Sequence, residues 1–244
     1  MDKSLGYKSK SLILSMFQKF QEHLADNFST LKNQKPLLAL SGGLDSCALL
    51  DLCLKSGIVP AIAHCNFKLR GAASDADAEW IKNLAHQKGL ECFIQSFETE
   101  IYSIQQKISI QMAARNLRYE WFDTLSEQYG YDLVLIAHHA DDAIETFMIN
   151  AMRGSGLKGL LGIPERRGKI VRPMLPFSRA DIIEYVEENK IEWREDSSNA
   201  KTDYLRNALR HEVIPAWKRR DSNFDVQFQD TLQYLGQAQA VLEG

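Results

Sequence analysis

Short apolar segments alternate along the chain with longer segments whose apolar residues recur at helical spacing. The apolar segments predict buried strands at residues 37–40, 58–64, 91–97, 132–137 and 169–172. The segments between them predict helices at residues 9–27, 44–55, 74–88, 108–129, 140–152 and 178–189. This alternation, with nearly continuous apolar strands, indicates an α/β fold with a Rossmann-like parallel sheet and helices on both faces.

The pattern changes beyond Asn199, where residues 203–218 and 223–242 are expected to be helical. We therefore expect an α/β domain at residues 1–200, with its N-terminal helix at 9–27. Residues 201–244 are expected to form a helical extension, or the start of a linker to a further domain. Ser74 with Asp77 is a candidate start signal for the third predicted helix.

Composition narrows the class of protein. Apolar residues make up 45% of the 244 residues, which is enough for a sizeable core. No apolar run is long enough for a signal-peptide core or a membrane span, so we expect a cytoplasmic protein with no membrane association. The four cysteines show no CxxC spacing, which disfavours a zinc site, a redox pair or an iron–sulfur cluster.

Charge is distributed unevenly along the chain. The 29 basic and 32 acidic residues give a net charge of −3, which does not indicate a nucleic-acid-binding protein. Residues 153–179, however, hold seven basic residues against Glu165 alone, a local charge of +6 in a glycine-rich segment. Beside a ligand site, such a segment fits an RNA backbone, although a solvated surface loop is the simpler alternative.

The sequence Ser-Gly-Gly-Leu-Asp-Ser at residues 41–46 stands directly between a predicted strand and a predicted helix. The glycines allow a sharp turn that brings backbone N–H groups close to an anion, and the helix N-terminus adds unpaired donors. The Ser41 and Ser46 hydroxyls can donate to phosphate, whereas Asp45 would hold Mg²⁺. The segment is neither a Walker loop nor a GxGxxG motif, and an ordinary strand-to-helix turn is the alternative.

Further polar groups fall where other predicted strands and helices meet. Arg115 and Arg118 share a helix face, which suits phosphate or carboxylate recognition. Asp141 and Glu145 are like charges four residues apart, and Mg²⁺, an ammonium group or an arginine would offset their repulsion. Asp142 with Glu145 also resembles a capping box. His138 and His139 should face opposite sides, so at most one enters a site.

The loop at residues 41–46 resembles the PP-loop of ATP pyrophosphatases, which cleave ATP between the α- and β-phosphates. Further segments resemble the tRNA(Ile)-lysidine synthetases in order and spacing. These segments are residues 64–71, 113–119, 137–146 and 153–156, then Arg172-Pro173, Asp196, Ser197 and Arg206-Asn207. The chain departs from the family at Phe67, where histidine is frequent, and at Ala143, where glutamine is frequent.

The resemblance implies a ligase of the PP-loop fold that uses ATP and Mg²⁺. Such an enzyme adenylates the wobble cytidine of tRNA(Ile) with a CAU anticodon at C2 and attaches free L-lysine, forming a carbon–nitrogen bond. The implied catalytic residues are Asp45, Arg115, Asp142 and Glu145. The candidates for the base that deprotonates lysine are Asp141, Asp142, Glu145 and His138. The implied nucleotide contacts are Ser41, Gly42, Gly43, Leu44, Asp45, Ser46, Arg70 and His138.

The implied tRNA contacts are Arg118, Arg153, Lys158, Arg166, Arg167, Arg172 and Arg206. Many members of the family continue into C-terminal tRNA-binding domains, and a homodimer stays open as an alternative to a monomer. A tRNA thiolase, an amidotransferase-type synthetase and a non-catalytic ATP- or AMP-binding module are the alternative functions. Thiolases of this group usually carry cysteine pairs, which this sequence lacks.

Overall fold

The computed structural model describes residues 14–194 and 204–243. Helix α1 (Met16–Asn27) begins at a Ser15 cap, whose hydroxyl accepts from the Gln18 N–H. The part of the expected N-terminal helix at residues 9–13 lies outside the described residues, and so do Asp196 and Ser197.

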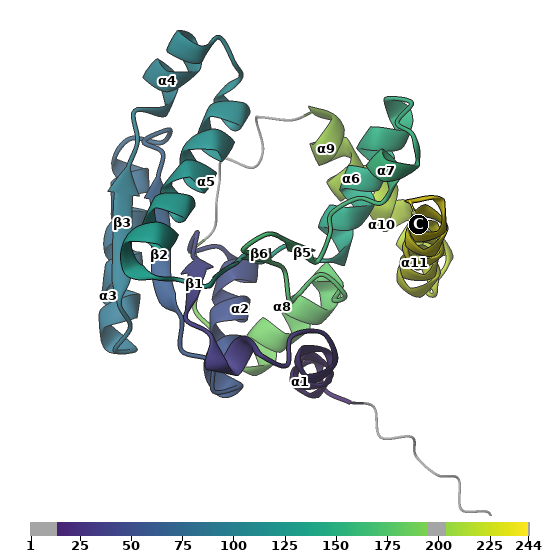
Figure 1. The fold of residues 1–244 in the computed structure, drawn as a ribbon, viewed down its shortest axis with the longest axis horizontal. Helices are drawn as coiled ribbons and strands as arrows, with labels where there is room; N and C mark the ends of the chain where they lie inside the picture. Colours follow the sequence, from purple (N-terminus) through teal and green to yellow (C-terminus); the bar gives the residue numbers. More distant parts are fainter. Residues whose placement is uncertain (1–13, 195–203, 244) are drawn as a thin grey trace, which may run out of the picture.

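One six-stranded sheet organises the described chain, in the order β3-β2-β1-β4-β6-β5 (Figure 1). Neighbouring strands are parallel except for the β5–β6 pair, which is antiparallel. The strand bounds are β1 (Pro36–Ala39), β2 (Ala61–Asn66), β3 (Cys92–Ser96), β4 (Leu133–Leu135), β5 (Arg166–Arg167) and β6 (Ile170–Val171). The Rossmann-like parallel sheet expected from the sequence is therefore confirmed, with one short antiparallel edge.

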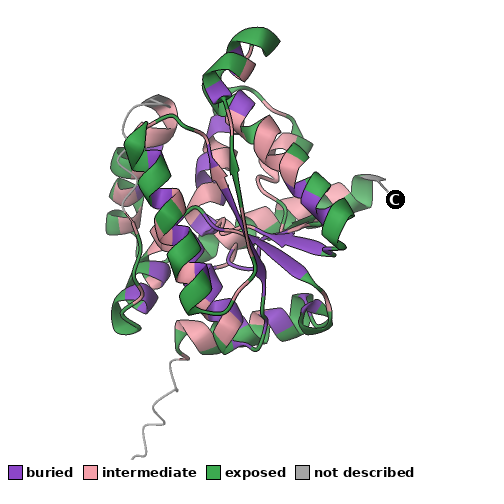
Figure 2. Ribbon diagram, turned by 90° about the vertical axis from the view of Figure 1, so that its left-hand side faces the viewer, coloured by how far each residue is buried: buried purple, intermediate pink, exposed green. Residues whose placement is uncertain are grey.

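Alternate residues of the central strands enter two different cores, as the pleat requires. Leu38 of β1 packs into the larger core, with helices α1, α2 (Leu44–Lys55), α3 (Ala72–Gln87) and α8 (Arg179–Glu188). Leu37 packs on the opposite face against Phe122 and Leu125 of helix α5 (Ile110–Tyr129). Figure 2 shows the buried strands enclosed between more exposed helices. Burial on both faces explains the nearly continuous apolar strands.

Helix α6 (Ala140–Met152) leads from the end of β4 to a helical region beside the sheet (Figure 1). This region contains α7 (Leu157–Leu160), α9 (Tyr204–Ala208), the π-helical segment η3 (Leu209–Val213), α10 (Ile214–Arg220) and α11 (Phe224–Glu243). A separate apolar cluster around Ile144, Leu209 and Ile214 joins α6 to these later helices. The helical character expected after residue 203 is thus confirmed.

The predicted bounds of α2 and α6 agree with the structure, and most other bounds shift by a few residues. Ser74 and Asp77 do not start α3, which begins at Ala72 after Gly71. The sequence reading missed the short helix α4 (Thr99–Gln106), the 3₁₀ turn η1 (Leu31–Asn33), α7 and β5. None of the helices in the described residues is long and apolar enough to span a membrane.

Candidate active site

The loop between β1 and α2 forms an anion cradle at the carboxyl edge of the sheet. Gly42 has a φ of +89°, which only glycine adopts without strain, and Gly43 caps α2 with extended backbone. The Ser41 hydroxyl lies 3.0 Å from the Ser46 hydroxyl and accepts from the Gly43 N–H at 3.2 Å. The two serines therefore fix the loop, and the first turn of α2 presents its free N–H groups to an anion.

A cavity of about 710 Å³ opens above this loop. It is bordered by the ends of β1, β2 and β4, by α5 and α8, and by the segment after α8. The expected site residues that line it are Ser41, Gly43, Leu44, Asp45, Ser46, Arg70, Arg118, His138 and Asp142. Arg115 and Glu145 are not among the lining residues. The volume is large enough for a nucleotide with room for a second group.

Asp45 is the carboxylate of the loop, and Arg179 at the start of α8 holds it. The Arg179 guanidinium donates to both Asp45 oxygens, at 3.2 and 3.1 Å. The buried His139 places its Nε2 3.8 Å from Asp45. No cluster of three or more metal-binding side chains exists among the described residues. A single loop carboxylate still suits Mg²⁺, because this ion usually takes one or two protein carboxylates and completes its shell with phosphate oxygens and water.

The two adjacent histidines after β4 have different surroundings. His138 lines the cavity, and its Nδ1 lies 2.9 Å from the Nε of the buried Arg172. Burial above all lowers the pKa of His138 to about 4, and the neighbours Arg172, His139 and Arg118 act in the same direction against the opposing charge of Asp142. His139 is buried and lies 3.6 Å from Asp142. The ring of His138 is therefore neutral at physiological pH.

Asp142 and Glu145 are not related by a capping box, contrary to that reading of the sequence. A capping box of these two residues would make Asp142 the cap of α6, but the helix starts one turn earlier, with His139 as its cap. The Asp142 carboxylate accepts from the His139 N–H at 3.0 Å. Asp142 thereby neutralises the helix start, and it also accepts from Arg210 at 2.9 Å. Burial opposes its ionisation, yet the two histidines, the His139 N–H and Arg210 hold the pKa of Asp142 below its ordinary value.

Glu145 is fully buried and is bound by arginines from the later helices. Arg210 donates to its two oxygens at 2.6 and 3.1 Å, and Arg206 donates at 3.0 Å. Burial raises the pKa of Glu145 against the influence of Arg210. Asp141, the other carboxylate in the first turn of α6, accepts from Lys218 at 2.7 Å. The cations that offset these like charges thus come from the protein itself.

A family model described as the PP-loop domain matches residues 15–217. The chain belongs to the PP-loop domain family. This assignment includes ATP binding, and it agrees with the cradle at Ser41–Ser46.

Curated relatives of this PP-loop domain carry the name tRNA(Ile)-lysidine synthase. The relative from Bacteroides thetaiotaomicron is 43% identical over 185 residues, which cover 76% of this chain and 43% of the relative. The relative from Chlorobaculum tepidum is 40% identical over 207 residues, 83% of this chain and 62% of the relative. The PP-loop domain described here thus spans only about half the length of these relatives.

Among solved structures, a U34-tRNA thiolase from Methanococcus maripaludis shares the fold. Its TM-score is 0.73 at 16% identity, with 89% of this chain and 78% of the thiolase covered. At that identity the likeness supports the PP-loop fold and does not extend to function.

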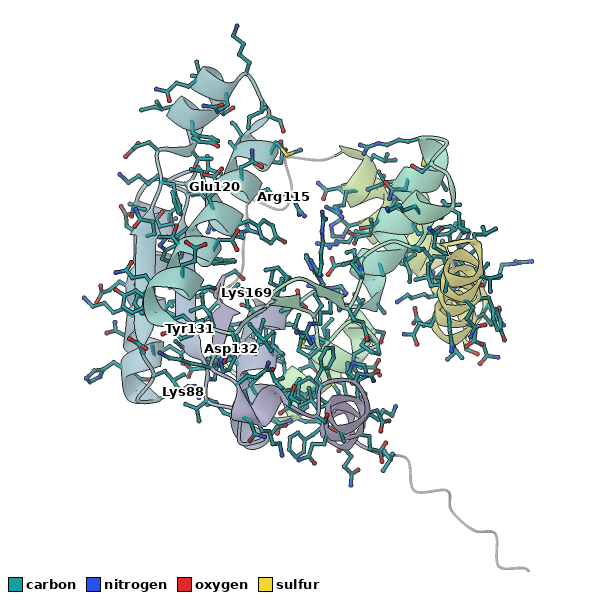
Figure 3. All side chains as sticks on the ribbon, in the orientation of Figure 1. Lys88, Arg115, Glu120, Tyr131, Asp132 and Lys169 are labelled. Atoms are coloured by element: carbon teal, nitrogen blue, oxygen red, sulfur yellow. The ribbon has the colours of Figure 1, made fainter. Side chains whose placement is uncertain are left out.

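Some of the basic residues that were expected to bind phosphate or tRNA are exposed, and others contact protein groups. Arg115 is exposed, stacks on Tyr119 at 4.8 Å, and leaves α5 on the side that faces α6 and α7 (Figure 3). Arg118 lies over the Phe67 ring at 5.3 Å inside the cavity. The predicted tRNA contacts that are exposed are Arg153, Lys158, Arg166 and Arg167. Arg172 and Arg206 instead contact protein groups, and their role toward tRNA stays a prediction.

Sequence reasoning missed several residues that the PP-loop domain brings to the cavity. Arg179 is the last residue of the basic segment at residues 153–179, and its position directly after the α8 cap Ser178 is the signal that could have placed it beside Asp45. Asp77 binds both Arg70 and Arg194, so Arg70 is held by a carboxylate at the cavity wall. Arg210 and His64 also line the cavity. His64 begins one of the segments that carry the family resemblance, whereas nothing in the local sequence pattern distinguished Arg210 from an ordinary structural residue.

Proposed function

We propose that this chain is the ATP-binding catalytic domain of a tRNA(Ile)-lysidine synthetase. In this proposal it adenylates the wobble cytidine of tRNA(Ile) at C2 and then joins lysine to that carbon, releasing pyrophosphate and AMP. One observation carries the proposal. The anion cradle opens into a cavity that also contains arginines and a carboxylate, and named lysidine synthases share 40 to 43% identity across this region.

The first step needs a phosphate site and charge neutralisation. The C2 oxygen of cytidine would attack the α-phosphorus of ATP, and the bond from that phosphorus to pyrophosphate would break. The N–H groups of the loop and of α2 would hold the phosphates, and the hydroxyls of Ser41 and Ser46 would donate to them. Positioning and charge neutralisation are the main requirements of phosphoryl transfer, and Arg179 stands beside the loop for this purpose.

Mg²⁺ would be held by Asp45 together with the phosphates, and it supplies further neutralisation of phosphate charge when bound. Arg179 binds both oxygens of Asp45 and so orients this carboxylate toward the loop. Asp45 is not part of a preformed cluster of acidic ligands among the residues that the structure describes. Ion and nucleotide would therefore bind together, which accords with the weak affinity of Mg²⁺ for single carboxylates.

The second step attaches lysine. Its amine would attack C2 of the activated base, lose a proton, and expel AMP together with the former C2 oxygen. A carboxylate must lie near the amine, both to bind it and to accept the proton. Among the catalytic candidates Asp142 lines the cavity, whereas Glu145 is enclosed by Arg206 and Arg210. We therefore assign contact with the amine to Asp142, and we assign to Glu145 the positioning of Arg210.

The RNA would approach over the basic segment. Arg153, Lys158, Arg166 and Arg167 are exposed, and Arg115 extends from α5 toward α6 and α7 (Figure 3). The guanidinium groups and the Lys158 ammonium at these positions suit successive phosphates of an RNA strand. An enzyme with tRNA and ATP as substrates would act in the cytoplasm.

The test is release of pyrophosphate from ATP·Mg²⁺ together with incorporation of labelled lysine into RNA. Unmodified tRNA(Ile) with cytidine at the wobble position is compared with the same RNA carrying uridine there. We expect both signals only with the cytidine RNA, and loss of both in Asp45→Asn. Label entering with another amino acid would change the proposed substrate. Absence of both signals from a folded protein that binds tRNA would refute the proposal.

A tRNA thiolase is the second candidate, because a thiolase shares the fold. The cysteines argue against it. Cys47 and Cys53 are buried, and burial raises the pKa of each to about 12, so neither thiol ionises readily. The pKa of Cys65 has the same shift for the same first cause, and Arg118 lowers it only in part. A sulfur-transfer assay with the same tRNA should be negative.

A further inference from the structure

Two histidines line the cavity, and each has a neighbour that can play only one hydrogen-bonding role. The Nδ1 of His64 lies 2.9 Å from the carbonyl oxygen of Leu40. A carbonyl only accepts, so this Nδ1 carries the hydrogen and Nε2 is left as an acceptor. The Nδ1 of His138 lies 2.9 Å from Nε of Arg172. A guanidinium only donates, so this Nδ1 accepts and the ring hydrogen is on Nε2.

Arg172 can act only as a donor toward His138, and its side chain is held in place. Its side chain is buried, and a second nitrogen donates to the Pro164 carbonyl at 2.8 Å. Tyr119 also bonds to it. Arginine stays charged throughout the pH range in which proteins work, even where burial lowers its pKa as it does here. The contact with Pro164 also fixes the direction in which Nε points, so the tautomer of His138 is determined by the fold.

We propose that Arg172 is a positioning residue that fixes His138 as a neutral donor, and that His138 donates from Nε2 to an oxygen of the reactants. The second half rests on the proposed function, which supplies the candidate oxygens, namely the C2 oxygen of the pyrimidine or a phosphate oxygen. His138 is then not the base that takes the proton from the amine, because Arg172 occupies its lone pair. Asp142, His139, Arg118 and Arg172 are the charged or titratable groups around the ring. The low pKa of His138 agrees with a ring that stays uncharged.

His64 provides an internal contrast in the same cavity. Its Nε2 is buried and has no hydrogen-bond partner within the described part of the chain. The two rings therefore have opposite tautomers, with the hydrogen on Nδ1 in His64 and on Nε2 in His138.

The tautomers can be measured without substrate. Protein labelled with ¹⁵N at histidine is examined at neutral pH by long-range proton–nitrogen correlation, with His138→Gln and His64→Gln used to assign the two rings. We expect a protonated Nε2 in His138 and a protonated Nδ1 in His64. In Arg172→Met, His138 should no longer be restricted to the tautomer protonated at Nε2, whereas the tautomer of His64 should stay unchanged. A protonated Nδ1 in His138 of the native protein would overturn the proposal, whatever the activity is.

The second half of the proposal is that His138 donates from Nε2 to an oxygen of the reactants. It is tested with two variants of His138, so the test does not depend on whether the Arg172 variant folds. Glutamine places an amide donor near the position of Nε2, whereas phenylalanine keeps the ring shape without a donor. For lysine incorporation we expect His138→Phe to lose about a hundredfold or more, as removal of one donor to a reacting oxygen does. His138→Gln should stay within about tenfold of the native rate with an unshifted pH profile. Equal losses in the two variants would assign His138 as a base and overturn this half. A native protein with no lysine incorporation would instead contradict the proposed function, and the tautomer result would stand.

Discussion

Replacing Glu145 with glutamine should destabilise the protein, because this carboxylate is buried between two arginines. The substitution keeps the shape of the side chain and removes its charge. The new amide nitrogen would face guanidinium donors, so at least one of the three hydrogen bonds from Arg206 and Arg210 would be lost. The arginines would be left with less negative charge around them.

The magnitude follows from how far each partner reaches water. Removing one partner of a buried ion pair costs about 3–5 kcal/mol. Here the carboxylate is 0% exposed, but the side chains of Arg206 and Arg210 are 42% and 25% exposed. Arg210 also keeps its bond to Asp142. Water and Asp142 therefore compensate part of the loss, and we expect a decrease of about 2 kcal/mol in the free energy of unfolding.

Urea unfolding, followed by circular dichroism and tryptophan fluorescence, measures this decrease. Glu98→Gln is the matched control, since it makes the same chemical change at the exposed pair of Glu98 with Lys68. The control should leave the unfolding midpoint unchanged. If Glu145→Gln behaved like the control and lost only activity, Glu145 would be a ligand contact, and the structural role argued above would be wrong.

Three further predictions concern the loop, a helix start and the cavity. Gly42→Ala should lower the free energy of unfolding by about 1–2 kcal/mol and weaken ATP binding, because φ at Gly42 is +89°. Gly43→Ala is the control, since φ at Gly43 is −74°, and it should leave stability nearly unchanged. Urea denaturation measures the stability of both variants, and nucleotide titration measures their ATP binding. Ser109→Ala removes the hydroxyl that accepts from the Met112 N–H at the start of α5. This variant should lower the free energy of unfolding by about 1 kcal/mol. Ser222→Ala, at an exposed position, is the control. His138 should make stability fall as pH falls from about 6.5 to 4, because its pKa is about 4 in the folded protein and the unfolded chain takes up the proton first. His138→Gln should remove about 2–3 kcal/mol of this pH dependence, and an unchanged stability profile would contradict the assigned pKa.

The sheet, the phosphate loop and the position of the cavity could be predicted because each follows from local pattern. Leu37 and Leu38 face different cores, so a continuous apolar segment indicated a strand buried on both sides. Two glycines between such a strand and a helix predicted the turn at Gly42. The carboxyl ends of parallel strands meet at one edge, which predicted that Ser41 and His138 would lie near one cavity.

The partners of the carboxylates could not be predicted, because they depend on contacts distant in sequence. Arg206 is 61 residues from Glu145, and Lys218 is 77 residues from Asp141. The sequence left Mg²⁺, an ammonium group and an arginine as equal candidates for these charges. The predicted pairing of Asp142 with Glu145 in a capping box was wrong because the helix starts three residues earlier. The cap residue is His139, which is not a usual cap residue, and its N–H donates to the Asp142 carboxylate. The helix α4 was missed because its buried residues, Thr99 and Ser103, are polar.

The ion pairs of α6 bear on where the catalytic unit ends. The change in sequence pattern predicts a domain boundary at residue 200. The first turns of α6 nevertheless bind across that division, with Asp141 on Lys218, Asp142 on Arg210, and Glu145 on both Arg206 and Arg210. Asp142 and Arg210 also line the cavity. A shift of the later helices would therefore move a guanidinium at the cavity wall and leave a buried carboxylate without its partners, at a cost of several kcal/mol. The helices after residue 203 thus supply Arg210 to the cavity wall, and under the proposed function any domain that holds them in place would act on the chemistry through Arg210.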